Sequence, residues 1–571
     1  MGKKKKHKKE DGDKAAKKAR QAGGKSRKPA GKTVSKPAKP SRKMRKQAEP
    51  DLESPRPVSP VTRKGTRPRA KTASAPAKAG GALRILFVAS ECTPFAKIGG
   101  LADAVAALPK ALIRLGHDVR ILMPLYRGVD REKHRIRFRS SVCVHMGQGE
   151  ENWVGLHETL LEDTVPVYFI EHDRFYGRAG IYDDWEWGEY GDNAFRFALL
   201  CKSALQVCKD LDFIPHVLHG HDWPGALCGA FLKTWDRVLS PLSQTASVLT
   251  IHNIGHQGVY HASVFPYLGL GGDYFHPGVI EDHGKVNLLK AGVFFADAIT
   301  TVSPTYKEEI KTPLGGQGLA PFLNGRHEDF FGVLNGVDYE HWDPATDPLL
   351  PARYSGEDLR GKARCKFALQ ERMGLARDAE APIFGVVSRF ARQKGFDLLK
   401  EALPRALQDM HCQVVVLGQG DPATEDFFRW LVQTYPGKAG AQIGFSNETA
   451  HLIEAGSDFF LMPSLYEPCG LNQMYSLKYG TLPVVRATGG LEDTVVNYNE
   501  STGEGTGFKF YEPSGMAVYY TMGWAVSTWF DRPQHIDRMR AAAMAQDFGW
   551  HKPAAQYEKV YRHALEKRKK W

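Results

Sequence analysis

From residue 82 to the C-terminus, short apolar runs alternate with segments of helical periodicity, and this alternation limits the possible folds more than any other feature. Repeated strand–helix units are typical of a parallel sheet covered by helices. Candidate strands of the first half lie at 84–90, 118–122, 167–170, 216–219, 247–251 and 298–302. The second half repeats the arrangement at 382–388, 413–417, 441–444, 458–462 and 482–486. We predict an α/β protein built from two similar halves.

Helical periodicity follows several of these strands. After the first strand, apolar residues recur at helical spacing and stop at Gly116, and Pro109 should kink this helix or shift its boundary. In the second half we expect helices at 395–408, 449–455 and 471–479, and a final helix at 550–569. The turn-rich stretch after residues 332–338 suits an interdomain hinge. The predicted parts are a tail at 1–81, an N-terminal domain at 82–330, a C-terminal domain at 331–549 and a final helix at 550–571.

The positive charge is concentrated at the N-terminus. The formal net charge is +13 and the isoelectric point is near 9.1, but residues 1–80 hold 27 Lys and Arg against 6 Asp and Glu. The remainder holds 50 basic and 58 acidic residues, so it is mildly acidic. The tail has no aromatic residue, no Ile and no Cys, and we predict that it is disordered. It is either a solubilising extension or a weak binder of polyanions such as nucleic acid.

Targeting and cysteine patterns favour a cytoplasmic protein. The polybasic start lacks the apolar core of a signal peptide, and no apolar run is long enough to span a bilayer. The eight cysteines are scattered without a CxxC pair, which fits reduced thiols better than disulfides or a zinc site. We therefore expect no membrane partner. The oligomeric state stays open.

Basic residues follow the first strand of each half. Lys97 lies in KIGG, and Arg389 and Lys394 lie in SRFARQKG. Ligands of open α/β sheets collect beyond the carboxyl ends of the strands, where loop amides favour anions. The two basic loops therefore indicate an enzyme that binds a diphosphate between its two halves. The alternative for the first loop is an ordinary glycine-rich turn with a solvated lysine. The chain lacks the G-x-G-x-x-G typical of nicotinamide enzymes at this turn.

Polar residues follow two later strands of the first half, in HGHDW at 219–223 and TIHN at 250–253. Two histidines beside an aspartate could bind a metal, but no further ligand cluster accompanies them. Asp, Asn and His side chains at strand ends, with an aromatic ring nearby, also suit a hydroxyl-rich ligand such as a sugar. At least one of these histidines could instead serve a structural hydrogen bond.

Three loops of the second half carry similar chemistry. They are GQG at 418–420, PSLYEPCG at 463–470, which contains Glu467, and ATGG at 487–490. Each alone could be an ordinary loop between a strand and a helix. Their joint placement at one kind of strand end favours a common binding site.

These motifs together resemble bacterial glycogen synthases and plant starch synthases, which are retaining glucosyltransferases of the GT-B fold. The resemblance runs from about residue 83 to the C-terminus and rests on KIGGLADA, HGHDW, TIHN, NGVD, SRFARQKG, PSLYEPCGLNQMYSLKYG and TGGLEDTV. It implies two Rossmann-like domains facing a central cleft, with the final helix crossing back to the N-terminal domain. The implied reaction transfers glucose from ADP-glucose to the non-reducing end of an α-1,4-glucan such as glycogen with retention, without a cofactor or a metal.

Other functions stay open at this stage. The donor could be UDP-glucose. A phosphorylase-like enzyme would need a lysine-bound pyridoxal phosphate and usually a longer chain. A protein of a different class would bind nucleic acid through the basic tail, although the acidic remainder argues against that as the main role.

The resemblance also implies site residues, one motif position at a time. The implied catalytic residues are Arg389, Lys394, Glu467 and His252. Implied donor-binding residues are Lys97, Gly99, Gly100, Gly418, Cys469, Gly470, Thr488, Gly489 and Gly490. Implied sugar and acceptor residues are Asp103, Asp222 and Asn253. Relatives of this fold commonly carry a second Glu eight residues after the first, where this chain has Tyr475.

Overall fold

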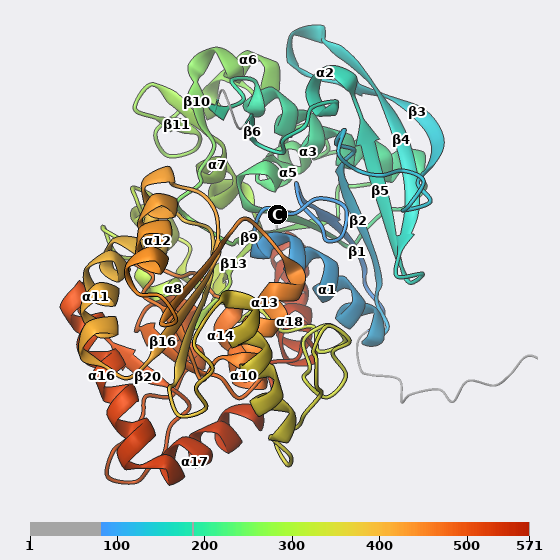
Figure 1. Cartoon of the computed structure of the whole chain (residues 1–571). Helices are drawn as coiled ribbons and strands as arrows, with labels where there is room; N and C mark the ends of the chain where they lie inside the picture. The colour runs from blue at the N-terminus through green and yellow to red at the C-terminus, as the bar shows by residue number, and fades with distance from the viewer. Residues whose placement is uncertain (1–80, 185–187, 570–571) are drawn as a thin grey trace, which may run out of the picture. The chain divides into compact units, whose positions relative to one another are not determined.

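The computed structural model describes residues 81–184 and 188–569 (Figure 1). The basic tail predicted to be disordered lies outside the described residues, apart from residue 81. The described chain contains two large sheets, one formed before residue 333 and one after residue 382. The predicted domain boundaries themselves stay predictions.

The N-terminal sheet has nine strands, of which seven are parallel. Their order across the sheet is β14-β13-β9-β8-β1-β2-β5-β4-β3. All six predicted strands are present, within three residues at each end. Their bounds are β1 (Arg84–Val88), β2 (Asp118–Pro124), β5 (Val165–Glu171), β8 (Val217–His221), β9 (Ala246–Ile251) and β13 (Ala298–Thr301). The prediction missed β14 (Phe330–Gly332) and the antiparallel pair β3 (Arg137–His145) and β4 (Glu151–Leu161).

The C-terminal sheet has six parallel strands in the order β17-β16-β15-β18-β19-β20. The five predicted strands are present as β15 (Ile383–Val387), β16 (Gln413–Gly418), β17 (Ala439–Ile443), β18 (Phe459–Met462) and β19 (Leu482–Arg486). The three-residue strand β20 (Phe508–Phe510) was not predicted. The expected helices of this half are α11 (Phe396–Asp409), α13 (Asn447–Gly456) and α14 (Asn472–Lys478).

Both sheets have the doubly wound topology. Counted in chain order, the parallel strands of each sheet run 3-2-1-4-5-6, with β14 as a seventh strand in the N-terminal sheet. This order reverses direction between strands 1 and 4, and ligands of such sheets bind at that switch point. The switch point lies between β1 and β8 in the first sheet and between β15 and β18 in the second.

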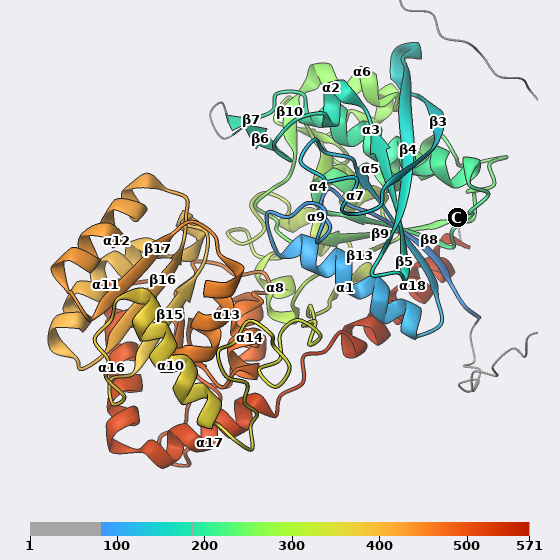
Figure 2. The same ribbon diagram turned by 45° about the vertical axis from the view of Figure 1, so that its right-hand side comes forward.

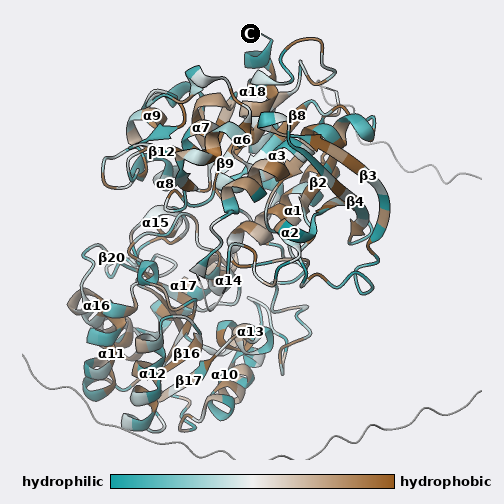
Figure 3. Cartoon of the chain, turned by 90° about the horizontal axis from the view of Figure 1, so that it is seen from above, coloured by the Kyte–Doolittle hydropathy of each residue, from teal (hydrophilic) through white to brown (hydrophobic). Residues whose placement is uncertain are grey.

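Burial explains why the strands were predictable. Central parallel strands are covered by helices on both faces, so they read as continuous apolar runs. Four of the five residues of β1 are buried, and all six residues of β9 are. In Figure 3 the brown strands lie among helices that carry teal residues on their outer faces.

The first helix differs from its prediction. Helix α1 (Gly100–Arg114) continues five residues beyond Pro109, so the expected shift of its boundary is wrong, and the alternative, a kink at Pro109, stays a prediction. Proline removes one backbone hydrogen bond within a helix. Pro109 is buried together with Leu108 and Leu112, and burial of this face in the core offsets the loss.

The last helix packs on the N-terminal sheet although it follows the C-terminal one. In α18 (His551–Arg568), the residues Ala554, Tyr557 and Tyr561 belong to the same hydrophobic core as the N-terminal strands. Both ribbon views place this helix, in red, beside the blue α1 (Figure 2). The chain therefore crosses from one half to the other twice.

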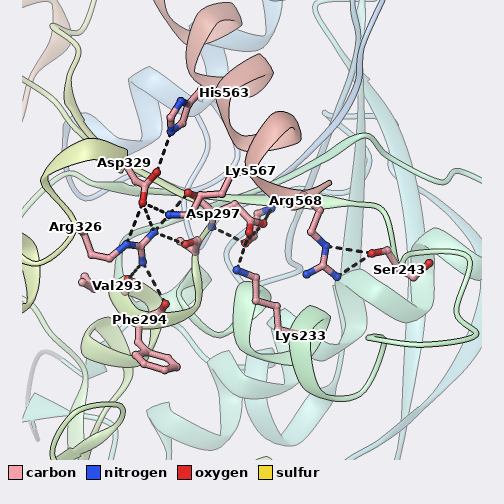
Figure 4. Close-up of polar contacts among 12 residues, drawn as sticks. Lys233, Ser243, Val293, Phe294, Asp297, Arg326, Asp329, His563, Lys567 and Arg568 are labelled. Atoms are coloured by element: carbon pink, nitrogen blue, oxygen red, sulfur yellow. Dashed lines mark hydrogen bonds and ion pairs between the residues drawn. The ribbon is translucent and has the colours of Figure 1, made fainter. Parts of the chain in front are cut away.

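Polar contacts hold the end of α18 in place (Figure 4). The carboxylate of Asp329 pairs with Lys567, His563 and Arg326. The Arg568 guanidinium donates to the carbonyl oxygen of Ser243 at 2.8 Å. These contacts tie the final two turns to the N-terminal half.

The segment between the two sheets is tied to both. Asp338 accepts a hydrogen bond of 2.6 Å from Lys110 of α1. Further along the segment, the Trp342 ring is stacked between the rings of His451 and Tyr475, at centroid distances of 3.9 and 4.0 Å. Tyr475, at the position of the second Glu of related folds, thus packs against the interdomain segment.

Within the described ranges, no helix combines the length and the apolar character needed to cross a membrane.

Candidate functional site

The site is built from the loops that leave both switch points. In the C-terminal half, the loop after β15 carries Arg389 and Lys394, and the loop after β18 carries Glu467. In the N-terminal half, the loop after β1 carries Lys97, and β8 ends directly before Asp222. The motifs predicted to act together therefore follow strands that pair side by side.

Lys394 and Glu467 form the central pair of the C-terminal half. The Lys394 Nζ lies 2.6 Å from Oε2 of Glu467, and the Ser464 hydroxyl donates to the same oxygen at 2.9 Å. Glu467 is 5% exposed, so its carboxylate depends on these partners. Arg389 stands on the same loop as Lys394 and is exposed. An exposed cation and a partly buried ion pair thus stand on neighbouring positions of these loops.

Backbone contacts fix these loops to each other. The Leu465 amide donates to the Gln393 carbonyl at 2.8 Å, and the Gln393 side chain donates to the Tyr466 carbonyl. From β19, Arg486 donates to the carbonyl oxygens of Ser464 and Leu465. These bonds fix the positions of Lys394 and Glu467 relative to each other.

The glycines of ATGG are needed for close packing against the Glu467 loop. A Cβ at Gly489 would lie 2.0 Å from the carbonyl oxygen of Glu467, and one at Gly490 would lie 1.9 Å from that of Cys469. A side chain cannot be accommodated at such distances, so the two loops require glycine here. Gly418 and Gly470 are likewise packed against neighbouring protein atoms, so protein contacts already account for all four glycines.

Cys469 and Thr488 are buried among these packed loops. Burial raises the pKa of the Cys469 thiol to about 12, so the sulfur is protonated at neutral pH. Thr488 donates from its hydroxyl to Oε1 of Glu309, and the Gly489 amide donates to the same oxygen at 2.9 Å. Glu309 ends α8 (Pro304–Glu309), the helix after β13. A carboxylate of the N-terminal half therefore accepts the hydrogen bonds of the ATGG turn.

In the N-terminal half, the KIGG loop is held by Glu91, which sequence reasoning did not select. The Glu91 carboxylate accepts from the amides of Ile98 at 2.6 Å and Gly99 at 3.1 Å, and from the Tyr182 hydroxyl at 2.7 Å. Burial raises its pKa in spite of these donors. The Gly99 amide, predicted to contact the donor, is thus bonded to protein.

Lys97 and Asp103 pair with each other. The Nζ of the exposed Lys97 lies 2.7 Å from the carboxylate of Asp103, which stands in the first turn of α1. A surface ion pair of this kind contributes little stability, so both side chains can reorient towards a ligand. Gly100 begins α1, and a Cβ there would meet Leu471 of the C-terminal half at 3.4 Å.

Asp222 supports the TIHN loop through its backbone. Its Oδ1 accepts from the amides of His252 at 2.6 Å and Asn253 at 3.2 Å. Desolvation raises the pKa of Asp222 to about 7, although the two amides oppose this shift. Asp222 has a φ of 50°, a left-handed conformation that Asp and Asn adopt more readily than most residues.

His252 belongs to a buried group of three histidines. Its Nε2 lies 3.1 Å from Nδ1 of His221, and the His221 ring packs 4.2 Å from that of His219. His219 is bonded to the Tyr561 and Thr250 hydroxyls, at 3.0 and 2.6 Å. Burial lowers the pKa of His252 to about 3, so its ring is neutral at neutral pH. The predicted structural role for one of these histidines fits His219.

Several contacts bring the two halves of the site together. The Tyr466 hydroxyl bonds to the Asn253 side chain, and Arg389 is close enough to Glu91 and His256 to shift their pKa values electrostatically. Glu309 bonds to the ATGG turn as described. The loops that carry the residues expected on the donor side therefore contact the loops that carry the residues expected on the sugar side.

A metal-binding interpretation gains no support from the side-chain arrangement. No group of three or more His, Cys, Asp or Glu side chains suited to hold a metal ion occurs among residues 81–184 and 188–569. The expectation that no metal or cofactor takes part stays a prediction.

Sequence reasoning missed several residues that shape the site. Glu91, His221, Glu309 and Tyr466 touch predicted residues, and Phe445 is 76% exposed on the loop after β17. His221 and Tyr466 stood within motifs that were quoted, so proximity to those motifs was the available signal. Their contacts depend on segments up to about 200 residues apart.

Comparison with known proteins places this arrangement in a family. The family described as "Starch synthase catalytic domain" matches residues 84–325, and "Glycosyl transferases group 1" matches residues 369–518. Glycogen synthase 1 of Geobacter metallireducens is 46% identical over 488 residues, which cover 85% of this chain and 97% of that protein. Glycogen synthase of Treponema denticola is 46% identical over 491 residues, covering 85% and 99%.

Solved structures agree. The catalytic domain of starch synthase IV from Arabidopsis thaliana, bound to ADP and acarbose, has a TM-score of 0.79 at 32% identity and covers 85% of this chain and 100% of that one. Sucrose-phosphate synthase from Thermosynechococcus elongatus, at 16% identity and a TM-score of 0.53, covers 84% and 98% and supports the fold alone. The predicted α/β architecture, the GT-B fold and the predicted enzyme class are thus confirmed. With its two switch-point loops and its relatives across 85% of its length, the chain belongs to the glycogen synthase and starch synthase family of glycosyltransferases.

Proposed function

We propose that the protein transfers a glucosyl residue from ADP-glucose to the non-reducing end of an α-1,4-glucan such as glycogen, with retention of the anomeric configuration. The observation that carries the proposal is the meeting of two unlike groups of side chains. Arg389 and the Lys394–Glu467 pair come from one switch point, and His252, Asp222 and Asn253 come from the other. A relative of the same fold binds ADP and acarbose.

The C-terminal loops supply the charge that the donor needs. Arg389 and Lys394 are cations on a short loop at the switch point, and cations there stabilise the charge that develops on a departing diphosphate. Glu467 holds Lys394 in position and offers its second carboxylate oxygen to the glucose hydroxyls. Lys97 would approach the diphosphate from the other half, where its partner Asp103 faces the acceptor.

The N-terminal groups suit an uncharged sugar. His252 is neutral, and Asn253 presents an amide that can both donate and accept hydrogen bonds. Asp222 orders the backbone that carries both of them. Neutral groups of fixed geometry recognise hydroxyls by direction without a large cost in desolvation.

In the proposed step, the bond from the anomeric carbon to the diphosphate oxygen breaks and a bond to the 4-hydroxyl oxygen of the acceptor forms on the same face. The hydroxyl proton passes to the departing diphosphate. No pair of carboxylates placed as in glycoside hydrolases is needed for such a step. Closure of the two halves would exclude water that could otherwise hydrolyse the donor.

An exposed aromatic ring is available for the donor base. Phe445 follows β17, and the adjacent Gly444 amide donates to the Gly418 carbonyl at 2.9 Å. Gly418 ends β16, which pairs with β15, the strand before the Arg389 loop. A flat apolar ring can stack on a base. We include Phe445 in the donor site on this ground.

The test is incubation of the full chain with glycogen and either ADP-glucose or UDP-glucose, followed by measurement of nucleoside diphosphate release and of chain extension. ADP release coupled to glucan growth, faster than UDP release, is the expected result. Faster release from UDP-glucose would overturn the assigned donor, and no release from either would overturn the function. The anomeric configuration of the product, read by NMR, tests retention. The cytoplasmic location and the polyanion-binding role of the tail stay predictions.

A further inference from the structure

We infer that His221 is a positioning residue that fixes the protonation of His252, by donating a hydrogen bond from its own Nδ1 to Nε2 of His252. The imidazole of His252 then carries its proton on Nδ1. The family resemblance implies a role for His252 but none for His221. Its part in catalysis rests on the proposed function, whereas the protonation pattern does not.

The imidazole rings of His221 and His252 are buried next to each other. His221 is 2% exposed and lies at the end of β8, and His252 follows β9, which pairs with β8 in parallel. The rings of Phe87 and His219 pack against His221, at centroid distances of 5.0 and 4.2 Å. The 3.1 Å separation between Nδ1 of His221 and Nε2 of His252 is a hydrogen bond, so one proton lies between these nitrogens.

Both rings are neutral in this setting. Removal of an imidazole from water disfavours its charged form. The pKa of His221 is well below its ordinary value because of burial and the nearby histidines, and that of His252 is lowered by burial. Each ring therefore carries a single proton, and only two arrangements of the pair are possible.

The other nitrogen of His221 distinguishes between the two arrangements. Its Nε2 is buried and has no hydrogen-bond partner within the part of the chain that the structure describes. If His252 were the donor, His221 would carry its proton on this Nε2, which would be a buried N–H without an acceptor. Such orphaned donors are rare in proteins. If His221 is the donor, its proton is bonded and Nε2 holds only a bare lone pair.

The second arrangement has a consequence for the site. With Nε2 accepting from His221, the remaining nitrogen of His252 is a donor, and it cannot act as a base at neutral pH. His252 thus offers one N–H of defined direction, in the same loop where the Asn253 side chain bonds to Tyr466. A donor of this kind matches a sugar hydroxyl oxygen.

The chain offers a matched control in His219. It lies on the same strand, is also buried, and packs against His221, but it bonds to Tyr561 and Thr250 and not to His252. Replacement of His219 therefore disturbs the packing without removing the proposed donor. His221→Asn places an amide donor near the position of Nδ1, and His221→Leu removes the donor at similar volume.

The experiment records the imidazole 15N resonances of the full chain, labelled at histidine, without substrate. His252 is assigned by the signals lost in His252→Gln. The expected result is a protonated Nδ1 and an unprotonated Nε2 for His252 in the wild type, in His221→Asn and in His219→Leu, and a changed pattern in His221→Leu. A protonated Nε2 in the wild type would overturn the inference, as would an unchanged pattern in His221→Leu.

Glucan synthesis supplies the second readout. His221→Leu should lower kcat/KM roughly ten- to a hundredfold, the range for a partner that orients a functional histidine, and His221→Asn should recover most of it. Equal losses in the Leu and Asn variants would overturn the positioning role. If the wild type makes no glucan while His252 shows the expected pattern, the proposed function fails and the inference about the proton stands. If His221→Leu does not fold, the wild-type and His221→Asn spectra still decide.

Discussion

The two halves of the site share one topology and differ in their electrostatics. Both place functional loops at the switch point of a 3-2-1-4-5-6 sheet. In the N-terminal half, burial keeps His252 neutral and raises the pKa values of Asp222 and Glu91. In the C-terminal half, Lys394 and Glu467 form an ion pair at 2.6 Å.

Under the proposed function, this difference would let one fold serve two kinds of ligand chemistry. Sugar hydroxyls are neutral and are recognised by directed donors and acceptors, which the N-terminal half holds on strand ends and backbone amides. A diphosphate is anionic and is recognised by cations, which the C-terminal half holds on loops. The expected effects of substitution therefore differ between the halves.

The largest effect is expected from the charges of the C-terminal half. Lys394→Ala should lower kcat by about a thousandfold, near the upper range for loss of one group that stabilises a developing anion. Glu467→Ala should have a similar effect, because Lys394 then loses the carboxylate that holds it in position. Initial rates with ADP-glucose and glycogen measure this, and circular dichroism checks that the variants are folded.

A matched control is Lys400→Ala on α11, which pairs with Asp397 on the surface and should leave the rate within a factor of about two. Near-full turnover of either site variant would show that the role given to that residue is wrong.

A smaller effect is expected at Asp222 in the N-terminal half. Its pKa is raised to about 7, and the ionised carboxylate binds the His252 and Asn253 amides more strongly than the protonated one. The kcat/KM of the wild type should therefore rise as pH increases through about 7. Asp222→Asn should remove this rise and lower kcat/KM roughly ten- to a hundredfold.

Asparagine also tolerates the left-handed backbone at this position, whereas Asp222→Ala should lose about 1 kcal/mol more stability. Persistence of the pH-dependent rise in Asp222→Asn would assign it to another group.

A still smaller effect is expected at Glu91. Glu91→Gln keeps an oxygen that can accept from the Ile98 and Gly99 amides but removes the charge near Arg389. It should change the KM for the donor by roughly tenfold or less, while Glu91→Ala, which releases the loop, should have the larger effect. Steady-state kinetics at varied ADP-glucose concentration measure this. Equal kinetics of both variants would show that the loop does not depend on this carboxylate.

The smallest effect at neutral pH concerns stability. The folded-state pKa values of His219, His221 and His252 are depressed, so these rings stay neutral in the fold but protonate in the unfolded chain below about pH 6.5. The free energy of unfolding should fall as pH drops from about 6.5 towards 3, by up to about 1.4 kcal/mol per pH unit for each ring.

Urea unfolding at pH 7 and pH 5 tests this expectation. His219→Leu should be less stable at pH 7 but show a smaller pH dependence, because one ring no longer takes up a proton on unfolding. The same pH dependence in this variant and the wild type would mean that His219 does not contribute.

The central strands could be predicted because burial on both faces leaves a local signature. β1 and β9 are rich in apolar residues and almost entirely buried, and their ends were placed within two residues. The pair β3 and β4 was missed because its strands alternate exposed and buried residues at the edge of the sheet. β20 has only three residues and carries too little periodicity to be recognised.

The site was predictable where it follows strand ends and not where it depends on partners. Lys394 and Glu467 were each selected from their motifs, but their ion pair joins residues 73 positions apart. Glu91 and His221 were not selected as site residues, because they act through other residues. Glu91 bonds to the Gly99 amide, and His221 bonds to the ring of His252. Such contacts arise when strands distant in sequence pair across the sheet.

By itself, the sequence determined the α/β class, the repeated halves and the strand ends that carry the candidate functional groups, because these follow from local patterns of apolar and polar residues. Only the tertiary structure decided which groups form hydrogen bonds and ion pairs, and which buried side chains stay ionised. The proton on His252, the raised pKa of Asp222 and the bonded amides of the KIGG loop all depend on neighbours supplied by other strands. Desolvation and hydrogen bonding act through space, so they are absent from any local segment of the chain.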